Sequence, residues 1–497
     1  MLTILAIGCL IIWLPVFVYL IARRGFAVLL IWLLIGPVAS NVVSHPSENP
    51  FCELRPVAER EEMAIAAEKA YLTEQTTIKL NEVLDPTRII VAGCLALFLL
   101  DSLLKKKFVI PFDRTEICMA VFCLILILGV ILQSRNVAFG LHVAIDSFII
   151  PFGSYFLARR FVMSEDRLRQ VVRMLAYAGA YLIVVCLVER LTHPVLLYRL
   201  KGPFINGAIL LSITMEVVFF VALVDMFGTR DQLPRSVRWF VLCLAPVIVL
   251  FTWSRGNWLG LLLGVATFLF LGRQFIPSRD KILATGLVLV LLSVSVVAMQ
   301  ILAHSDQIGG RVLNEQNVYG RFATWMIVLK EFGKSPIFGL GLNNLRDILG
   351  KESSQVESAN SFKTEHNSFL GLLAETGIVG FMAYLAVIGS IFQSGLKLCR
   401  NGLSSHARWA GIGVVSILVA YEVPGLFAST LKVVGLSHVY VYFLVGGILG
   451  LFARQESAVN AEKSWLRTSN YLQGLATSRH SKQLGQGTHP SAQATCR

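Results

Sequence analysis

The sequence predicts an all-α protein, a polytopic bundle of about 12–13 transmembrane helices with a large, partly helical extracytoplasmic loop. The first observation behind this prediction is composition. Of the 497 residues, 55% are hydrophobic and 15% are charged, and the mean hydropathy is +0.67. A soluble protein of this length is considerably more polar. The second observation is that apolar runs of roughly 20 residues recur, the length that crosses a bilayer core of about 30 Å as a helix.

In order along the chain, these runs predict the membrane spans. The first run has no basic segment before it and no small-residue cleavage site after it, so we interpret it as a retained helix rather than a secretory signal. The predicted spans lie near residues 2–21, 25–40, 88–104, 115–133, 140–158, 170–188, 207–228, 237–253, 257–272, 282–302, 372–396, 408–427 and 437–453.

The placement of charge orients these spans. Lys and Arg exceed Asp and Glu by 44 − 31 = 13 residues, an excess that in a soluble protein suggests a nucleic-acid partner. Here the excess gathers in every second connection, which marks the cytoplasmic side of a membrane and predicts no nucleic-acid partner. The alternate connections, 41–87 and 303–371, are longer and carry more acid, so they and the amino terminus are predicted outside. The basic residues include Arg23, Arg24, Lys105, Lys106, Lys107, Arg159, Arg160, Arg167, Arg169, Arg173, Arg230, Arg235, Arg238, Arg273, Arg279, Lys281, Lys397, Arg400 and Arg408.

The pattern divides the chain into four parts. The last part is rich in Ser, Gln, Gly and Thr and is predicted to be a disordered cytoplasmic tail. Most cysteines lie in apolar spans, and no disulfide framework, zinc motif, P-loop or Rossmann motif is visible, so no metal or cofactor is predicted. The four parts are residues 1–240 with the outer loop 41–87, residues 241–395 with the outer loop 303–371, residues 396–453, and residues 454–497.

The loop at 303–371 is the predicted place for chemistry, because a long connection between membrane helices usually has a function. Apolar residues at helical spacing predict an amphipathic surface helix that ends at Gly333, with Arg321 at the edge of its apolar face. In the stretch 335–341 that follows, a proline and two glycines break the helix and let the backbone run close to another element. The apolar residues are Val318, Phe322, Trp325, Leu329 and Phe332.

The end of the loop leads into the next span. Thr364 is predicted to be the N-cap of the helix that begins there. His366 is then predicted to lie in its first turn and to face the outer membrane surface. Gly377 and Gly380 predict tight packing within the membrane.

These residues together resemble the signature of the O-antigen ligase and polymerase superfamily, over roughly residues 240–395. Each motif alone is weak, but several in the right order on one side of the membrane are jointly specific. A further stretch, Arg199-Leu-Lys201-Gly-Pro-Phe-Ile-Asn206, is similar to a basic segment of the family, although the usual Pro-Asn pair is absent. The motifs are Thr252-Trp-Ser-Arg255-Gly, Arg321 with Trp325, Pro336-Ile-Phe-Gly-Leu-Gly341, His366-Asn-Ser-Phe-Leu370 and Glu375-Thr-Gly-Ile-Val-Gly380.

The resemblance implies a glycosyltransferase at the outer face of the bacterial cytoplasmic membrane. Its donor is a glycan on undecaprenyl diphosphate, and its acceptor is a hydroxyl of a glycolipid, a glycan or a protein; neither metal nor nucleotide takes part. The sequence does not choose between a ligase and a polymerase, because these share the chemistry and differ in the acceptor.

The residue types at the matching positions suit this reaction. Arg255 and Arg321 are predicted to hold the diphosphate, because guanidinium groups stay charged and bind phosphate oxygens bidentately. His366 is predicted to act as the base that deprotonates the acceptor, since its reference pKa is near neutrality. The remaining predicted substrate-binding residues are Arg199, Lys201, Asn206, Trp325, Glu365 and Asn367, of which Glu365 or Asn367 orients the His366 ring.

Each of these residues also has a simpler interpretation. Arg255 can mark a helix end as a snorkelling residue, Arg321 can contact lipid headgroups, and His366 can be a solvated or capping histidine. Acidic residues inside spans leave two other functions open, a transporter that uses buried acids and a noncatalytic membrane scaffold. For the ionisable residues inside the spans, pairing with arginine or backbone is the preferred interpretation. They are His142, Asp146, Glu216, Asp225 and Glu422.

Overall fold

Every regular element in the described part of the chain is a helix, and the all-α prediction is confirmed. The structure is a computed structural model, and the elements fall into two compact units, Met1–Gly450 and Leu451–Arg497. It describes residues 25–36, 86–104, 112–192, 200, 202, 207–229, 232–276, 315–353, 365–431 and 436–484.

Eight of the described helices are long and apolar enough to cross a membrane, so the chain is a multi-pass membrane protein. Two shorter apolar helices, Gly25–Gly36 and Thr87–Phe98, also match predicted spans, and so does a 17-residue helix, Arg235–Phe251. The predicted spans at 2–21 and 282–302 lie outside the described residues. The eight are Arg114–Gln133, Val137–Phe161, Glu165–Thr192, Ala208–Gly228, Arg255–Gly272, Ser368–Asn401, Ser405–Leu426 and Leu436–Leu466.

Two of the helices contain π-helical turns, and a 3-10 turn follows a third. The elements are α4 (Pro86–Leu104), α5 (Arg114–Gln133), α6 (Val137–Ala144), the π turn η2 (Ile145–Ile149), α7 (Ile150–Phe161), α8 (Glu165–Thr192), α9 (Ala208–Val224), the π turn η3 (Asp225–Thr229), α10 (Arg235–Phe251), α11 (Arg255–Gly272), α14 (Glu315–Phe332), α15 (Asn344–Ser353), α16 (Ser368–Asn401), α17 (Ser405–Glu422), the 3-10 turn η5 (Val423–Leu426) and α18 (Leu436–Leu484).

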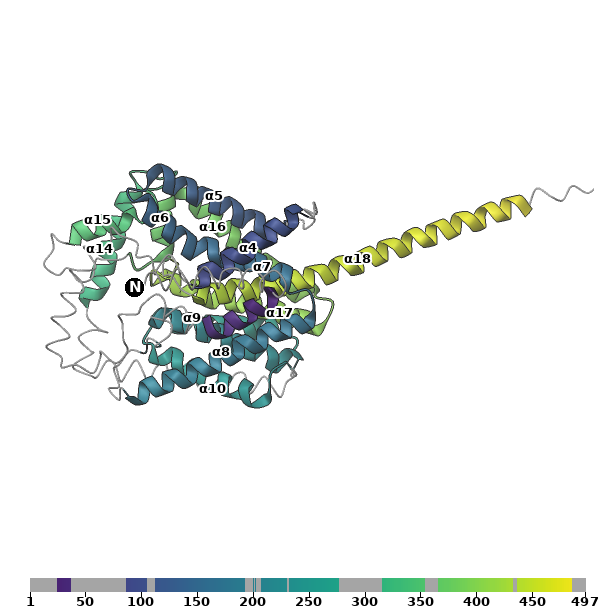
Figure 1. Cartoon of the computed structure of the whole chain (residues 1–497), viewed down its shortest axis with the longest axis horizontal. Helices are drawn as coiled ribbons and strands as arrows, with labels where there is room; N and C mark the ends of the chain where they lie inside the picture. Colours follow the sequence, from purple (N-terminus) through teal and green to yellow (C-terminus); the bar gives the residue numbers. More distant parts are fainter. Residues whose placement is uncertain are drawn as a thin grey trace, which may run out of the picture. The chain divides into compact units, whose positions relative to one another are not determined.

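The helices of the first unit lie side by side (Figure 1), and α17 has several helical neighbours. It packs against α11, α16 and α9. The approach of α11 is close because a Cβ on Gly260 would lie 2.6 Å from the Ala420 carbonyl oxygen. Small residues allow such contacts between membrane helices, where the hydrophobic effect does not drive association.

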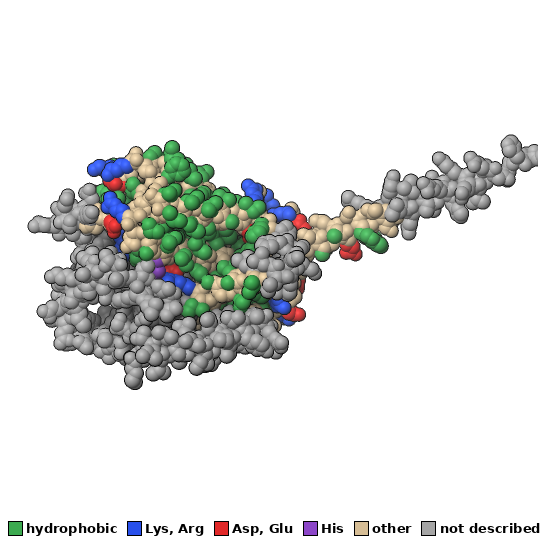
Figure 2. Space-filling view, turned by 45° about the horizontal axis from the view of Figure 1, so that its top comes forward, with side chains coloured by type: hydrophobic (Ala, Val, Ile, Leu, Met, Phe, Trp, Pro, Cys, Tyr) green, Lys and Arg blue, Asp and Glu red, His purple; other side chains and the backbone are tan. Residues whose placement is uncertain are grey.

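The surface of this unit has the distribution expected of a membrane protein. Figure 2 shows hydrophobic side chains spread over one face, with Lys and Arg at its two ends. On α5, Leu124 and Ile131 are 56% and 55% exposed. An apolar surface of this kind is not stable in water and marks an interface, here the one with lipid.

One helix, α16, is interrupted at Gly377, whose backbone is non-helical (φ 66°, ψ −174°). The ring of Phe369 lies 6.4 Å from the ring of Tyr384 and 6.5 Å from that of Phe381. In a continuous helix, Phe369 and Tyr384 would be separated by about 22 Å along the axis. The chain therefore turns back at Gly377, and the start of α16 lies beside its own middle.

The segment 336–341 fills this interruption. Its carbonyls accept bonds from the amides after the break, and its amides donate to the carbonyls before it, so the backbone groups that an interrupted helix exposes are satisfied. A Cβ on Gly339 (φ +80°) would lie 2.4 Å from the Glu375 carbonyl, which confirms the predicted close approach of this segment. The four bonds are Ile378 N to Pro336 O (2.9 Å), Val379 N to Ile337 O (3.2 Å), Leu340 N to Ala374 O (2.9 Å) and Gly341 N to Glu375 O (2.9 Å).

The residues just after this segment also bond to the turn between α5 and α6, at one end of the unit. The Ser134 hydroxyl donates to the Leu342 carbonyl at 3.0 Å, and the Arg135 amide donates to Asn344 Oδ1 at 3.0 Å. Helices α14 and α15 lie at this end (Figure 1). The motif-bearing loop and the α5–α6 turn therefore form one connected layer.

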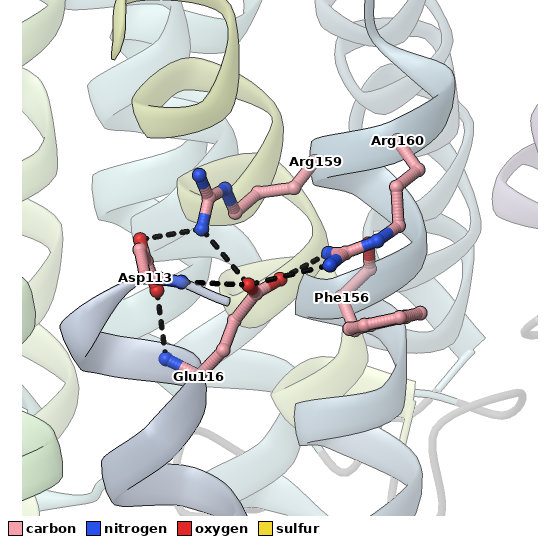
Figure 3. Close-up of polar contacts among 5 residues, drawn as sticks. All are labelled: Asp113, Glu116, Phe156, Arg159 and Arg160. Carbon is pink, nitrogen blue, oxygen red and sulfur yellow. Dashed lines mark hydrogen bonds and ion pairs between the residues drawn. The ribbon is translucent and has the colours of Figure 1, made fainter. Parts of the chain in front are cut away.

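At the other end of α5, four charged residues form a compact ionic network (Figure 3). Asp113 and Glu116 form a capping box, in which the Glu116 amide donates to Asp113 Oδ1 at 2.8 Å. Arg159 lies 2.5 Å from Asp113 and 3.1 Å from Glu116, and Arg160 pairs with Glu116 while it rests 3.3 Å from the centre of the Phe156 ring. The network fixes the start of α5 against the end of α7.

The second unit continues α18 as a helix to Leu484, and residues 485–497 lie outside the described part. This differs from the expectation of disorder after residue 454. The expectation of disorder rested on the content of polar residues such as Ser and Gln. The Ala, Glu, Lys and Leu residues between 454 and 484 favour a helix instead. Trp465 is exposed there.

Candidate active site

The first component of the site is the start of α11. Trp253 precedes it with a left-handed backbone (φ 51°), a conformation that costs energy for a large residue and that clusters at functional sites. The Ser254 hydroxyl does not cap the helix but donates to Asn257 Oδ1 at 2.6 Å. Arg255 is exposed in the first turn. A helix start with positive side chains favours an anion.

The second component is Arg321 on α14. Burial lowers the pKa of this half-buried guanidinium from its usual value, and the positive charge of Arg255 lowers the pKa further. The structure therefore brings these two arginines, 66 positions apart in the sequence, close enough to repel each other. Like charges held together in a partly buried site favour a bound anion.

The third component is the turn that carries His366. His366 also has a left-handed backbone (φ 48°) and is partly exposed. The predicted N-cap, Thr364, lies outside the described residues, and the N-cap of α16 is Asn367, whose Oδ1 accepts from Phe369 N at 3.1 Å and Leu370 N at 3.0 Å. The placement of His366 in the first helical turn is therefore wrong, because Asn367 caps the helix more effectively and leaves His366 outside it.

Two contacts join the three components at one end of the unit. The Trp325 indole, on α14, donates to the Glu365 carbonyl at 3.0 Å, so the arginine-bearing helix holds the His366 turn. The segment 423–431 joins this turn to α11. Ser368 bonds to Ala428 O at 2.9 Å and to Thr430 Oγ1 at 3.2 Å, while Pro424 and Phe427 pack against Gly256.

The other predicted site residues have different outcomes. Arg199, Lys201 and Asn206 lie outside the described residues. Glu365 is buried, with its carboxylate directly against Gly371, where a Cβ would lie 2.6 Å from Glu365 Oε1. Within the described ranges no group of three or more His, Cys, Asp or Glu side chains is placed to hold a metal ion. Metal-independent transfer stays a prediction.

The expectation that ionisable residues inside the spans pair with arginine or backbone is confirmed for the two aspartates, Asp146 and Asp225. Asp146, in the π turn η2, forms an ion pair with Arg88. The Arg88 guanidinium also lies 3.1 Å from His142 Nδ1. Asp225, in the π turn η3, lies 3.0 Å from Arg238. A π turn inserts an extra residue into the helix and so re-aims a side chain, here an aspartate toward an arginine of another helix.

Among the described residues, the other two carboxylates form no ion pair with arginine. Glu216 is buried in α9 and faces Asn257, although no atom of Asn257 reaches Glu216 in good hydrogen-bond geometry. Glu422, the last residue of α17, accepts from the Tyr384 hydroxyl, which lies 3.2 Å from both carboxylate oxygens. Sequence patterns missed the Glu422–Tyr384 pair, because its members lie 38 positions apart and no motif contains either residue.

Comparison with known proteins identifies the part of the chain that contains the candidate active site. Residues 239–385 match the family model described as O-antigen ligase. An uncharacterised protein of Haemophilus influenzae is 25% identical over 183 residues, which cover 34% of this chain and 46% of that protein. The chain thus spans less than half the length of this relative. The matched region contains Arg255, Arg321, His366 and the interrupted start of α16, and over these residues the protein is similar to the O-antigen ligase family.

Proposed function

We propose that this protein transfers a glycan from undecaprenyl diphosphate to an acceptor hydroxyl at the outer face of the bacterial cytoplasmic membrane. The acceptor is a glycolipid, another lipid-linked glycan or a protein, so both the ligase and the polymerase are included. The observation that supports the proposal is the electrostatic interaction of Arg255 with Arg321, which lies on a helix whose Trp325 bonds to the turn before His366.

The two arginines bind the diphosphate in this proposal. The leaving group gains negative charge as the bond between the anomeric carbon and the phosphate oxygen breaks. The repulsion between two guanidinium groups is offset when a dianion lies between them. The interaction strengthens as charge develops, which is the condition for catalysis rather than for mere binding.

His366 accepts the proton of the acceptor hydroxyl as its oxygen attacks the anomeric carbon, and undecaprenyl diphosphate leaves with the bonding electron pair. A neutral imidazole is a suitable base near pH 7. The Trp325–Glu365 bond holds the His366 turn against the arginine-bearing α14, so that donor and base are positioned by one element.

The transporter alternative predicts an interrupted helix at a binding site, and α16 is interrupted. At that interruption, however, four backbone groups of α16 form hydrogen bonds with the segment 336–341. These groups are therefore not available to bind an ion. The interruption instead brings the start of α16 beside Tyr384.

The test is transfer by the purified full-length protein in liposomes with lipid-linked glycan as donor. Arg255→Ala, Arg321→Ala and His366→Ala are each expected to reduce the rate by about 10²-fold to 10⁴-fold. Arg169→Ala, which changes an exposed arginine on α8, is the matched control and is expected to retain the wild-type rate. Wild-type rates in all three site variants would contradict the proposal.

Arg321→Lys adds a pH signature. Burial and Arg255, which lower the pKa of Arg321, act in the same direction on a lysine, whose reference pKa is only about 10.4. A lysine is charged below its pKa and loses the charge as pH rises through it. The rate of the variant relative to wild type is therefore expected to fall between about pH 7 and pH 9.5, because the arginine stays charged there. A constant ratio would contradict the role of charge at this position.

A further inference from the structure

Glu422 has a different kind of partner from the arginine-paired acidic residues inside the spans of the described bundle, whereas Glu216 has no hydrogen-bond partner among the described residues. Asp146, Asp225 and Glu116 each pair with an arginine. In the described part of the chain, no Lys or Arg forms an ion pair with Glu422, and its partner is the neutral hydroxyl of Tyr384. A carboxyl at such a position is costly unless it has a further polar partner, and it is often functional.

The position of Glu422 is next to the candidate active site. It directly precedes η5, whose Pro424 packs against Gly256, the residue after Arg255. Gly425, in the same turn, contacts Ser368 and Phe369 at the start of α16. Glu422 thus lies at the junction of the segments that carry Arg255 and His366.

The interruption of α16 brings the second half of this pair into place. Because the chain turns back at Gly377, the ring of Phe369 lies 6.4 Å from the ring of Tyr384. Tyr384 is completely buried, and its hydroxyl points to Glu422, which itself keeps some exposed surface. The carboxylate is therefore held by tyrosine, and the Glu422 residue is not fully enclosed by the protein.

The chemistry of this arrangement fits a sugar. A carboxylate has about four acceptor positions, and the Tyr384 hydroxyl occupies only part of them. Neighbouring hydroxyl groups of a pyranose donate to both oxygens of one carboxylate, and the apolar face of the ring packs on aromatic side chains such as those near Tyr384. A few polar groups in an otherwise apolar surrounding orient a ligand.

We infer that Glu422, positioned by Tyr384, binds hydroxyl groups of a sugar unit of the lipid-linked glycan. The inference rests on the proposed function, because the diphosphate bound by the arginines places the first sugar beside them. Glu422 then acts as a binding residue that contacts the glycan and not the diphosphate. The base is still His366.

The test compares two ligands that share the lipid diphosphate and differ in the sugar. The full-length protein in nanodiscs is titrated with bare undecaprenyl diphosphate and with the lipid-linked glycan purified from the source bacterium. Glu422→Gln is expected to weaken binding of the glycan-bearing ligand by about tenfold or more, since a charge-assisted hydrogen bond is lost, and to leave binding of the bare ligand unchanged. Tyr384→Phe is expected to act in the same direction with a smaller effect.

Two control variants address folding. Tyr440→Phe removes the hydroxyl of another buried tyrosine, which donates to the Leu33 carbonyl, and Asp166→Asn removes an exposed carboxylate on α8. Both are expected to bind both ligands as wild type does. Arg321→Ala, which is expected to weaken binding of both ligands, is the reference for an effect that is not specific to sugar.

The outcomes separate the two proposals. Unchanged glycan binding in Glu422→Gln overturns the sugar-binding role and leaves the proposed function intact. An equal loss for both ligands in Glu422→Gln overturns the role as well, because the effect is then not specific to sugar. Wild-type protein that binds neither ligand overturns the proposed function and the sugar-binding role together.

Discussion

Single residues at the site are held in backbone conformations that few side chains adopt. In the described residues, three non-glycine positions have positive φ, and Trp253 and His366 are two of them. Trp253 lies two residues before Arg255, and His366 directly precedes Asn367; the sequence had already indicated Arg255, His366 and Asn367. Strain of this kind persists only where the surrounding contacts enforce it. The Trp325–Glu365 bond and the Asn367 cap supply such contacts around His366.

Gly377 and Gly339 give a residue-scale prediction for stability. Replacing either by Ala places a Cβ within 2.4 Å of backbone atoms of the facing segment, at a positive φ. We expect each change to lower the free energy of unfolding by about 2–4 kcal/mol, as strained backbone and overpacking add. Thermal unfolding of the purified protein in detergent measures this. Gly389→Ala, in the same helix with nothing within 4 Å, is the control and is expected to stabilise slightly. Equal stability of all three variants would contradict the close packing of the segment 336–341 into the interruption of α16.

At the scale of elements, the sequence predicted more of the fold than of the site. Apolar runs of membrane length located the helices, because burial in lipid demands them whatever the helices pack against. The motif order indicated Arg255, Arg321 and His366. The Tyr384–Glu422 contact was not predictable, since it depends on the reversal of the chain at Gly377, and a glycine in a span ordinarily signals only close packing.

The ionic network between α5 and α7 gives a prediction at this scale. Glu116 and Arg160 are almost fully buried, so Glu116→Gln leaves a buried guanidinium with weaker compensation and is expected to destabilise the protein by about 3 kcal/mol. Asp166→Asn, which breaks an exposed pair at 3.7 Å with Arg169, is expected to cost less than about 1 kcal/mol. Thermal unfolding of both variants checks the difference. Similar losses would show that burial does not set the strength of these pairs.

In the first unit, the helix ends near the motif-bearing segments lie opposite the helix ends that carry the basic connections. The motif-bearing segments gather where α5 ends and α16 begins, and the basic connections follow the other ends of the same helices. Arg159 and Arg160 at the end of α7 and Arg400 at the end of α16 belong to the basic set. Because basic residues tend to stay in the cytoplasm, this arrangement supports the proposal that the site faces outward. The separation was predictable, since charge asymmetry is a property of the sequence alone.

Sidedness is tested by labelling two turns with cysteine. Phe338 is 62% exposed in the segment that fills the α16 break, and Leu403 is 56% exposed in the turn between α16 and α17. In intact cells, a membrane-impermeant maleimide is expected to label Phe338→Cys and not Leu403→Cys, in a background without the natural cysteines. Both positions are expected to react in permeabilised membranes, which controls for access. Labelling of Leu403→Cys alone in intact cells would invert the orientation and move the arginine pair to the cytoplasm, away from an outward-facing glycan. The proposed reaction would then lose its donor, because the charge asymmetry would no longer put Arg255, Arg321 and His366 on the side where the glycan is presented.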